Sequence, residues 1–530
     1  MIRIRDITLP FDHKPDALKS QIAESLNISP SQILNFTIIR RSIDARHKNN
    51  IVAVYTIDVE IENQDQLSAV FSDKITLCPP GHMNYQMPKA HKNTSPRPLI
   101  VGSGPCGLFA ALLLAQLGQK PILIDRGKAV AERIKDVNSF WREGILNGES
   151  NVQFGQGGAG TFSDGKLTTQ IKDKLNRSVK VLNELVKAGA PEEILYQAKP
   201  HIGSDNLITV VKTICENITA LGGEVRFETK LTGINIKDSK VTGAVINGYE
   251  TIDTDTIVLA LGHSARDTFK MLAGLNIPIE AKPFSIGVRI EHHQSLINKT
   301  QYGKFASNPL LGSAEYKLVQ HCENARSAYT FCMCPGGEVI ASSSQPGEIV
   351  TNGMSFYKRN KPNANSALLV GITPQDFQSN DPLAGIEFQR KWEQKAYQLG
   401  GENYFAPIQL IGDFLANRPT TSTGQVTPSY SPGTTPTDLS RCLPDFVTET
   451  LRLAIPKLDN KLKGFAMHDA VMTAVESRSS SPIRILRNET FQSPTVEGLY
   501  PAGEGAGYAG GIISAAIDGL KTAEAIANKA

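Results

Sequence analysis

The chain has 530 residues, of which 40% are hydrophobic and 20% are charged, and its formal net charge at pH 7 is +3. A charge so close to zero gives no general electrostatic attraction to nucleic acid or to a membrane surface, so we expect neither DNA nor a membrane as a partner. The length predicts about three folded units. No segment has the apolar length that a bilayer requires, and the start of the chain lacks a signal-peptide core, which favours a cytoplasmic protein.

Residues 1–77 predict a small α+β domain. Apolar alternation indicates strands near 2–7, 35–40 and 51–60, and a helical stripe covers 17–26. The order strand, helix, strand, strand is that of half a ferredoxin-like fold.

The same domain carries a cluster of positive charge between two of its strands. The cluster consists of Arg40, Arg41, Arg46 and Lys48. It indicates a docking site for a protein or RNA partner, although a solvated loop is the commoner meaning of such a cluster.

Residues 78–98 follow and contain five prolines among polar residues, which prevents regular strand pairing and predicts a linker.

Residues 97–127 read as a strand, a glycine turn, a helix and a second strand that ends in an acid. Gly102 permits the tight turn, Gly104 lets the backbone approach a pyrophosphate, and Gly107 lets the helix pack close to the sheet. The phosphates then meet the N-terminus of that helix. Asp125 is placed to accept ribose hydroxyls. The segment therefore predicts a dinucleotide-binding βαβ unit, whose other cofactor contacts are Ser103, Pro105, Cys106 and Arg126.

Two distant segments favour FAD over NAD. Residues 256–262 form a short apolar strand that ends at a glycine, and residues 498–520 form a strand, a glycine-dense turn and a helix. They resemble the closing motifs of FAD-dependent oxidoreductases with the glutathione-reductase type of nucleotide fold. In that superfamily an acid after the last strand binds the ribitol, and the next helix directs its N-terminus at the flavin. The resemblance assigns FAD contacts to Ala260, Leu261, Gly262, Gly503, Glu504, Gly510, Gly511 and Ile512.

The segment 153–167 places five glycines within a dozen residues, which suits a backbone that wraps closely around a ligand. Together with 474–484 and the closing segment it resembles the bacterial family of uncharacterised FAD-dependent dehydrogenases. The resemblance covers nearly the whole chain and implies an FAD site, but it supplies no reaction. It adds as cofactor contacts Gly157, Gly158, Thr161, Phe162, Ser163 and Lys166.

The remaining segments complete the expected architecture. Strands near 222–247 predict the third strand and the β-meander of this fold, where Lys230 and Leu231 would lie near the adenine. The fold class is α/β: a Rossmann-like FAD domain of glutathione-reductase type (99–282 and 458–530), with an inserted antiparallel, β-rich substrate domain (283–457) that covers the flavin. Within this roof, a Thr-, Ser-, Pro- and Gly-rich stretch at 415–440 predicts either disorder or a lid.

Flavoenzymes leave the electron chemistry to the cofactor, and the protein supplies orientation, charge and proton donors. Three residues are catalytic candidates because they lie close to the cofactor motifs in sequence. Lys166 and Arg478 could stabilise a reduced, anionic flavin, and His263 could protonate a substrate. For each one, a structural or surface role is the competing interpretation.

The seven cysteines have no disulfide-framework spacing, which suits a reducing compartment. Cys332 and Cys334 lie two residues apart on one face of a predicted strand. They could form a thiol–disulfide couple that the flavin reduces or oxidises, could contact a substrate, or could simply pack, and packing is the commonest case. No further Cys or His pair has metal spacing, so we expect no metal site.

The sequence favours a small-molecule oxidoreductase with noncovalent FAD. Two alternatives stay open: flavin-dependent modification of a macromolecule such as tRNA, and a non-catalytic flavin-binding redox sensor or scaffold. No second glycine-rich βαβ unit is present to carry a nicotinamide cofactor. NADH or NADPH is therefore expected only as a transient electron donor.

Overall fold

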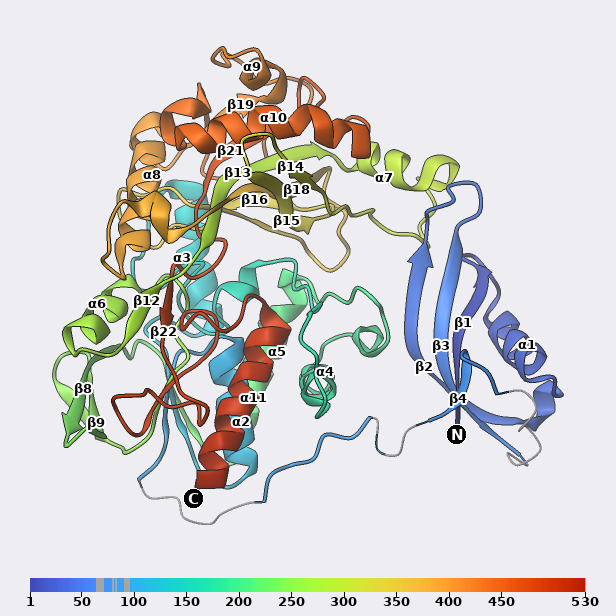
Figure 1. Cartoon of the computed structure of the whole chain (residues 1–530), viewed down its shortest axis with the longest axis horizontal. Coiled ribbons are helices and arrows are strands. Elements are labelled where there is room, and N and C mark those ends of the chain that lie inside the picture. The colour runs from blue at the N-terminus through green and yellow to red at the C-terminus, as the bar shows by residue number, and fades with distance from the viewer. Residues whose placement is uncertain (63–70, 79–80, 82, 90–95, 530) are drawn as a thin grey trace.

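The structure is a computed structural model that describes residues 1–62, 71–78, 81, 83–89 and 96–529. The described chain has three parts (Figure 1): a small N-terminal domain, a nucleotide-type domain with a parallel sheet, and a large, mainly antiparallel sheet that is inserted in that domain and lies over it. None of the helices in the described part of the chain is long and apolar enough to cross a membrane.

The N-terminal domain is a four-stranded antiparallel sheet with one described helix on it. The strand order is β2-β3-β1-β4. This order agrees with a ferredoxin-like sheet, whose second helix would fall between β3 and β4. Residues 63–70 in that connection lie outside the described residues, so the ferredoxin-like fold stays a prediction. The elements are β1 (Ile2–Pro10), α1 (Pro15–Leu26), η1 (Pro30–Gln32), β2 (Ile33–Asp44), β3 (Val52–Ile61) and β4 (Ile75–Leu77).

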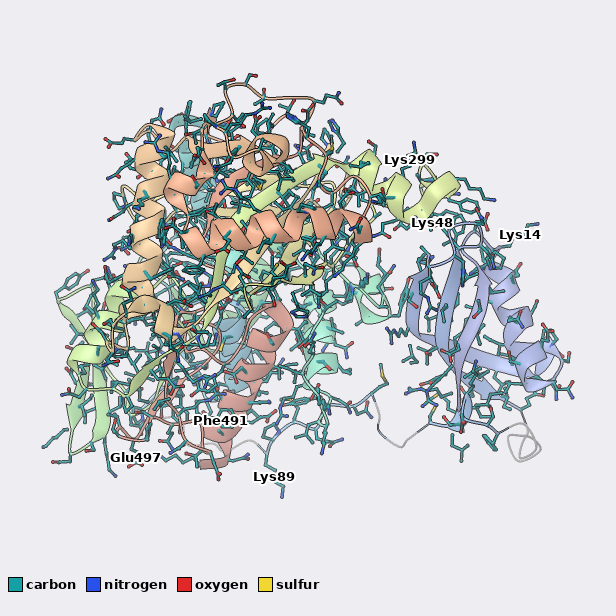
Figure 2. All side chains as sticks on the ribbon, turned by 45° about the horizontal axis from the view of Figure 1, so that its top comes forward. Lys14, Lys48, Lys89, Lys299, Phe491 and Glu497 are labelled. Atoms are coloured by element: carbon teal, nitrogen blue, oxygen red, sulfur yellow. The ribbon has the colours of Figure 1, made fainter. Side chains whose placement is uncertain are left out.

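This domain is docked on the rest of the chain by its edge strand. In β2, the backbone N–H of Arg41 donates to the carbonyl O of Tyr196 at 2.7 Å, and the N–H of Ala198 donates back to Arg41 at 2.8 Å. Near the β2–β3 turn, the rings of Phe11 and Phe305 meet edge-on with centroids 5.3 Å apart. Figure 2 shows Lys48 at the tip of this hairpin, close to α7 (Gln294–Tyr302).

The predicted basic cluster is therefore partly engaged within the chain. Arg46 pairs with Asp44, Arg41 donates to the Tyr55 hydroxyl at 3.2 Å, and Lys48 packs beside Gly303. Docking of a protein or RNA partner on this domain stays a prediction. The predicted linker at 78–98 falls partly on residues 79–80, 82 and 90–95, which lie outside the described residues.

The nucleotide-type domain contains a five-stranded parallel sheet in the order β23-β11-β5-β6-β7. The side chains of each strand alternate between two apolar cores: Ile100 packs under α2 and α11, whereas Leu99 and Val101 pack under the β-meander. The sheet and its helices are β5 (Leu99–Val101), α2 (Pro105–Gln116), β6 (Ile122–Ile124), α3 (Val130–Glu143), η3 (Ala159–Phe162), α4 (Arg177–Lys187), η4 (Glu192–Leu195), α5 (Ser204–Ala220), β7 (Glu224–Arg226), β11 (Ile257–Leu259), β23 (Leu499–Pro501) and α11 (Ile512–Lys529). The remaining elements are the meander β8 (Leu231–Lys237), β9 (Lys240–Ile246) and β10 (Glu250–Asp253), then α6 (Arg266–Gly274), β12 (Ile279–Ala281) and β22 (Ile483–Ile485).

The roof is a seven-stranded sheet in the order β14-β15-β18-β13-β21-β19-β20. Its outer face packs against α10, through residues such as Ile286 and Val288. The elements of the roof are β13 (Phe284–His293), α7, η5 (Gly303–Phe305), β14 (Val319–His321), β15 (Ser327–Cys334), β16 (Glu338–Ala341), β17 (Thr351–Met354), β18 (Asn363–Ile372), η6 (Pro374–Phe377), α8 (Ala384–Gly400), β19 (Ala406–Leu410), α9 (Ile411–Leu415), β20 (Thr434–Pro436), η7 (Leu439–Cys442), α10 (Asp445–Lys461) and β21 (Val471–Glu476).

Two sequence-based expectations need correction here. The boundary placed at 457/458 falls inside α10, and β21 belongs to the roof sheet because it pairs with both β13 and β19. The roof therefore continues to Glu476. The stretch 415–440 is not disordered: it contains β20, and Val426 and Tyr430 are buried in it.

Candidate functional site

The predicted cofactor segments meet at the carboxyl ends of the parallel strands. Gly102, after β5, has a φ of +105°, and a Cβ there would lie 2.5 Å from the carbonyl O of Ala260, after β11. The glycine-rich loop closes from the other side, because a Cβ on Gly158 would lie 2.9 Å from the Cα of Gly104. Side chains at these positions would push the segments apart, so glycine is what permits the contact.

The closing turn joins the same cluster. A Cβ on Gly503 would lie 2.8 Å from the Cβ of Cys106, in the first turn of α2. A Cβ on Gly160 would lie 3.4 Å from the side chain of Ile512, the first residue of α11. Four segments that are far apart in the sequence therefore form one cradle.

The cradle leaves space and donors for a ligand. A Cβ on Gly262 or Gly510 would have no neighbour within 4 Å, and one on Gly511 would meet only the Ser514 hydroxyl, at 3.9 Å. Gly104 is the N-cap of α2 and makes no side-chain capping bond, so the first N–H groups of that helix are not capped by its N-cap side chain. A pyrophosphate is the chemistry that such an N-terminus binds. The geometry fits an FAD molecule along the predicted segments.

The acid after β6 also shapes the glycine turn. Asp125 is buried and accepts from the N–H of Ser103 at 2.8 Å, from its hydroxyl at 2.7 Å, and from the N–H of Gly127 at 2.9 Å. Each carboxylate oxygen has two lone pairs, so acceptor capacity for a ribose hydroxyl remains. Its contact with ribose stays a prediction.

The predicted adenine region carries a network of four charges. Arg126 pairs with Glu149 at 2.6 Å and Asp267 at 2.7 Å, and Lys230 pairs with the same two acids at 3.0 and 2.7 Å. Burial raises the pKa of Asp267, but hydrogen bonds from both cations outweigh it and hold that pKa well below its usual range. Leu231 lies in the apolar core, so only its backbone is placed for ligand contact.

His263 and Glu504 meet at the edge of the cradle. The Nδ1 atom of His263 lies 3.1 Å from Oε1 of Glu504. The Nε2 atom of this histidine is buried and has no hydrogen-bond partner among the described residues. An unpartnered buried nitrogen beside an open glycine turn is a group that a ligand can satisfy.

The glycine-rich loop buries its charged residues against the roof. Asp164 pairs with Arg359, and the Nζ atom of Lys166 lies 3.5 Å from Asp164. Lys166 Nζ is buried and has no hydrogen-bond partner within the described chain. Burial lowers the pKa of Lys166, but Asp164 and the sulfurs of Cys334 and Cys332 raise it further, so this lysine stays protonated.

Other predicted contacts of this loop point into protein. Thr161 is fully buried and donates to the carbonyl O of Gln156 at 3.3 Å, and Phe162 packs against Trp141. The Ser163 hydroxyl donates to the carbonyl O of Gly160 at 2.7 Å. A cofactor would meet the backbone of this loop, chiefly at Gly157 and Gly158.

Arg478 lies in a buried cluster of polar and charged side chains, one of which, Ser264, follows His263 in the chain. Its Nε donates to Glu393, one terminal nitrogen donates to Ser264 and Ser344, and the other donates to Glu348 and Glu393. All five guanidinium N–H groups are used, so none is free for a flavin or a substrate. This geometry favours a structural role and argues against the predicted catalytic one.

The structure adds two features that sequence reasoning did not assign. One is a groove of about 750 Å³ along the roof, lined by Ser285, Tyr329, Gly371 and Ser480, among others. Beside it, Ser481 donates to the carbonyl O of Gly505 in the closing turn, so the groove adjoins the cradle. The other is the environment of Cys332 and Cys334, which includes the buried Arg289 from β13.

Comparisons with known proteins agree with the cofactor. Residues 283–479 match the family model described as FAD-dependent protein, C-terminal domain-like, and residues 1–60 match a domain of unknown function. The first range coincides with the roof. FAD is therefore the cofactor of this chain.

Solved structures that match the chain include glycine oxidase from Bacillus cereus, which is 12% identical, with 82% of this chain and 95% of that chain covered and a TM-score of 0.30. L-proline dehydrogenase from P. horikoshii is 13% identical, with 82% and 93% covered and a TM-score of 0.34.

A protein of Clostridium beijerinckii with the printed name "Uncharacterized protein" is 49% identical over 529 residues, which cover 100% of this chain and 99% of that protein. The present chain therefore belongs to the same family as this relative, and its roof matches the model of FAD-dependent proteins.

Proposed function

We propose that this protein is an FAD-dependent oxidoreductase that acts on a small organic substrate bound in the roof groove. The observation that carries the proposal is the link between groove and cradle: Ser480 lines the groove, and the segment that follows it hydrogen-bonds to the closing turn, from Ser481 to Gly505 and from Ile485 to Ala506. When bound, FAD supplies hydride or electron-pair transfer, which no amino-acid side chain provides. The nucleotide fold is proposed to be of the glutathione-reductase type, which the parallel sheet, the meander and the closing turn support.

The residues of the chain supply positioning, charge and a proton. The backbone of the glycine turn and the N-terminus of α2 would hold the pyrophosphate, and Glu504 would accept hydrogen bonds from the ribityl hydroxyls. Glu504, 3.1 Å from Nδ1, orients the ring of His263, and the buried, unpartnered Nε2 is the atom from which this histidine is proposed to donate a proton. Lys166 is proposed to stabilise negative charge at the interface of loop and roof.

The Gly104→Ala variant tests the cradle without disturbing the fold. Gly104 has a φ of −73°, and an alanine Cβ would have only an ordinary contact of 3.9 Å with Gly158. The added methyl group fills the space of the approaching pyrophosphate, so we expect FAD to bind at least ~10-fold more weakly, a change of about 1.4 kcal/mol. Gly274→Ala at the end of α6 is the matched control, because its Cβ would meet nothing within 4 Å.

The activity itself is tested by anaerobic absorbance spectroscopy of the FAD-loaded protein with NADH or NADPH. Bleaching of the flavin bands, followed by their return with an organic acceptor, supports the oxidoreductase. His263→Asn should slow the return more than the bleaching if this histidine donates a proton to the acceptor. Bleaching that no acceptor reverses would overturn the proposal and favour a redox sensor. The release of free flavin on acid precipitation tests noncovalent attachment.

A further inference from the structure

Cys332 and Cys334 lie in an irregular part of β15. The register between β15 and β18 shifts between Phe331 and Cys334, and Cys332 has a φ of +44°, in the left-handed region. In a regular strand, residues two apart have Cα atoms about 6.6 Å apart, near the upper limit for a disulfide of ~6.8 Å. Because of this bulge, Cys332 and Cys334 are not held in the extended spacing of a regular strand. The Cys334 thiol donates to the carbonyl O of Cys332 at 3.3 Å, and neither cysteine is in a disulfide.

Positive charge surrounds the pair. Arg289 is fully buried and places one terminal nitrogen 2.6 Å from the carbonyl O of Cys332 and 3.4 Å from Sγ of Cys334. The Lys166 ammonium, in the glycine-rich loop, lies 3.5 Å from Asp164 and has no hydrogen-bond partner among the described residues. The positive charges of Lys166 and Arg289 both act on Cys332.

Negative charge is also present but is paired. Asp164 is held by Arg359, and Glu476 of β21 accepts from Arg289 at 2.9 and 3.0 Å. The neighbouring Cys334 thiol and the charges of Lys166 and Arg289 lower the pKa of Cys332, although burial opposes them. The neighbouring Cys332 sulfur and burial raise the pKa of Cys334. This arrangement favours a thiolate at Cys332 and a thiol at Cys334.

The two sulfurs differ in access. Cys334 is fully buried, whereas Cys332 is half-buried and follows Phe331, which is 40% exposed. An attacking thiolate must be reached by its reaction partner, whereas a resolving thiol need only reach its neighbour. Cys332 has the first property and Cys334 the second.

We propose that Cys332 and Cys334 form a redox-active dithiol–disulfide pair whose oxidant is a small-molecule disulfide. The Cys332 thiolate attacks one sulfur of the disulfide, a mixed disulfide forms, and the first thiol leaves. Cys334, after loss of its proton, attacks Sγ of Cys332, forms the Cys332–Cys334 bond and expels the second thiol. Overall two protein thiols lose two electrons and two protons, and the disulfide gains both to become two thiols.

The first test uses alkylation of the FAD-loaded full chain by iodoacetamide at pH 6, read by peptide mass spectrometry. We expect Cys332 to react at least ~10-fold faster than Cys322, because a thiolate fraction controls the rate. Cys322 is the matched control: it is half-buried in the same domain, and burial raises its pKa. Equal rates at Cys332 and Cys322 would overturn the proposal.

The second test uses glutathione buffers of increasing oxidised fraction and peptide mapping without reduction. The unmodified chain should form the Cys332–Cys334 disulfide, and Cys334→Ser should instead accumulate glutathione on Cys332. Only the Cys332–glutathione adduct in the unmodified chain, or no modification at all, would contradict a resolving pair. Because the decisive sample is the unmodified chain, a variant that fails to fold leaves the test intact. Neither readout needs turnover, so this proposal and the oxidoreductase proposal can fail separately.

Discussion

Two clusters of buried charge lie in this molecule, and they use their hydrogen-bonding capacity differently. Around Arg478, the carboxylates of Glu393 and Glu348 and the hydroxyls of Ser264 and Ser344 occupy every guanidinium N–H. Around Cys332, the Lys166 ammonium has no hydrogen-bond partner in the described part of the chain. A saturated cluster holds elements together. An unsaturated one has capacity left for a ligand or a reaction, and it is costly to keep.

The largest expected effect is on stability, from Glu393→Ala. This carboxylate is fully buried and pairs with both Arg478 and Arg266, so its removal leaves two buried arginines that share the single carboxylate of Glu348. We expect a loss of about 3–5 kcal/mol in the free energy of unfolding, measured with urea. A loss below about 1 kcal/mol would contradict the structural role of the cluster.

His292, in β13, tests the cost of burying a polar atom without a partner, because its Nδ1 has no hydrogen-bond partner among the described residues. It is fully buried, its Nε2 lies 2.8 Å from the carbonyl O of Phe465, and burial lowers its pKa to about 4. The pKa of this histidine is about 6.5 in the unfolded chain, so below that pH protonation favours unfolding. The free energy of unfolding should therefore be unaffected by His292 above pH 6.5 and should fall by about 3 kcal/mol as the pH drops toward 4. His292→Phe should flatten this part of the pH–stability curve, and substitution of the exposed His47 by Gln should leave it unchanged.

The Lys166→Met variant removes the ammonium group beside Cys332 and retains an apolar side chain of similar length. The pKa of Cys332 should rise, and its alkylation rate at pH 6 should fall about tenfold, which corresponds to about 1.4 kcal/mol. Peptide mass spectrometry gives the rate. If Lys166 serves the FAD site alone, the rate will not change while FAD affinity does.

The smallest effect is expected at an exposed ion pair. Glu497 pairs with Lys240 at 3.0 Å and Lys529 at 2.8 Å, and all three side chains are largely exposed. Glu497→Ala should leave the urea unfolding midpoint close to that of the unmodified protein, because solvent screens such a pair, and this makes it the control for Glu393→Ala. A comparable loss at both sites would show that burial does not separate the two kinds of pair.

Local pattern was enough to predict the glycine turn, the parallel strands and the starts of α2 and α11, because turns and periodicity are properties of neighbouring residues. It also placed the cofactor segments whose contact the structure describes. It placed the end of the roof too early, since nothing near Val471 says that this strand pairs with β13 and β19.

The candidate site was harder to predict where partners are distant. Arg478 is 85 residues from Glu393 and 214 from Ser264, so its saturation has no signal in the sequence around it. The spacing of Cys332 and Cys334 identified the pair, but the bulge and the approach of Arg289 depend on the fold of three strands. The proline stretch gave no indication that the N-terminal domain docks by an edge strand.

That docking has a thermodynamic consequence. The segment 196–203 pairs with Arg41 of the N-terminal sheet at one end, and at the other Leu167 and Gly165 of the glycine-rich loop exchange backbone hydrogen bonds of 2.9 and 3.1 Å with Pro200 and Ile202. One strap therefore touches both the small domain and the loop of the FAD site. By linkage, a molecule that pulls the small domain away and loosens this strap changes the affinity for FAD by some factor, and FAD changes the affinity for that molecule by the same factor.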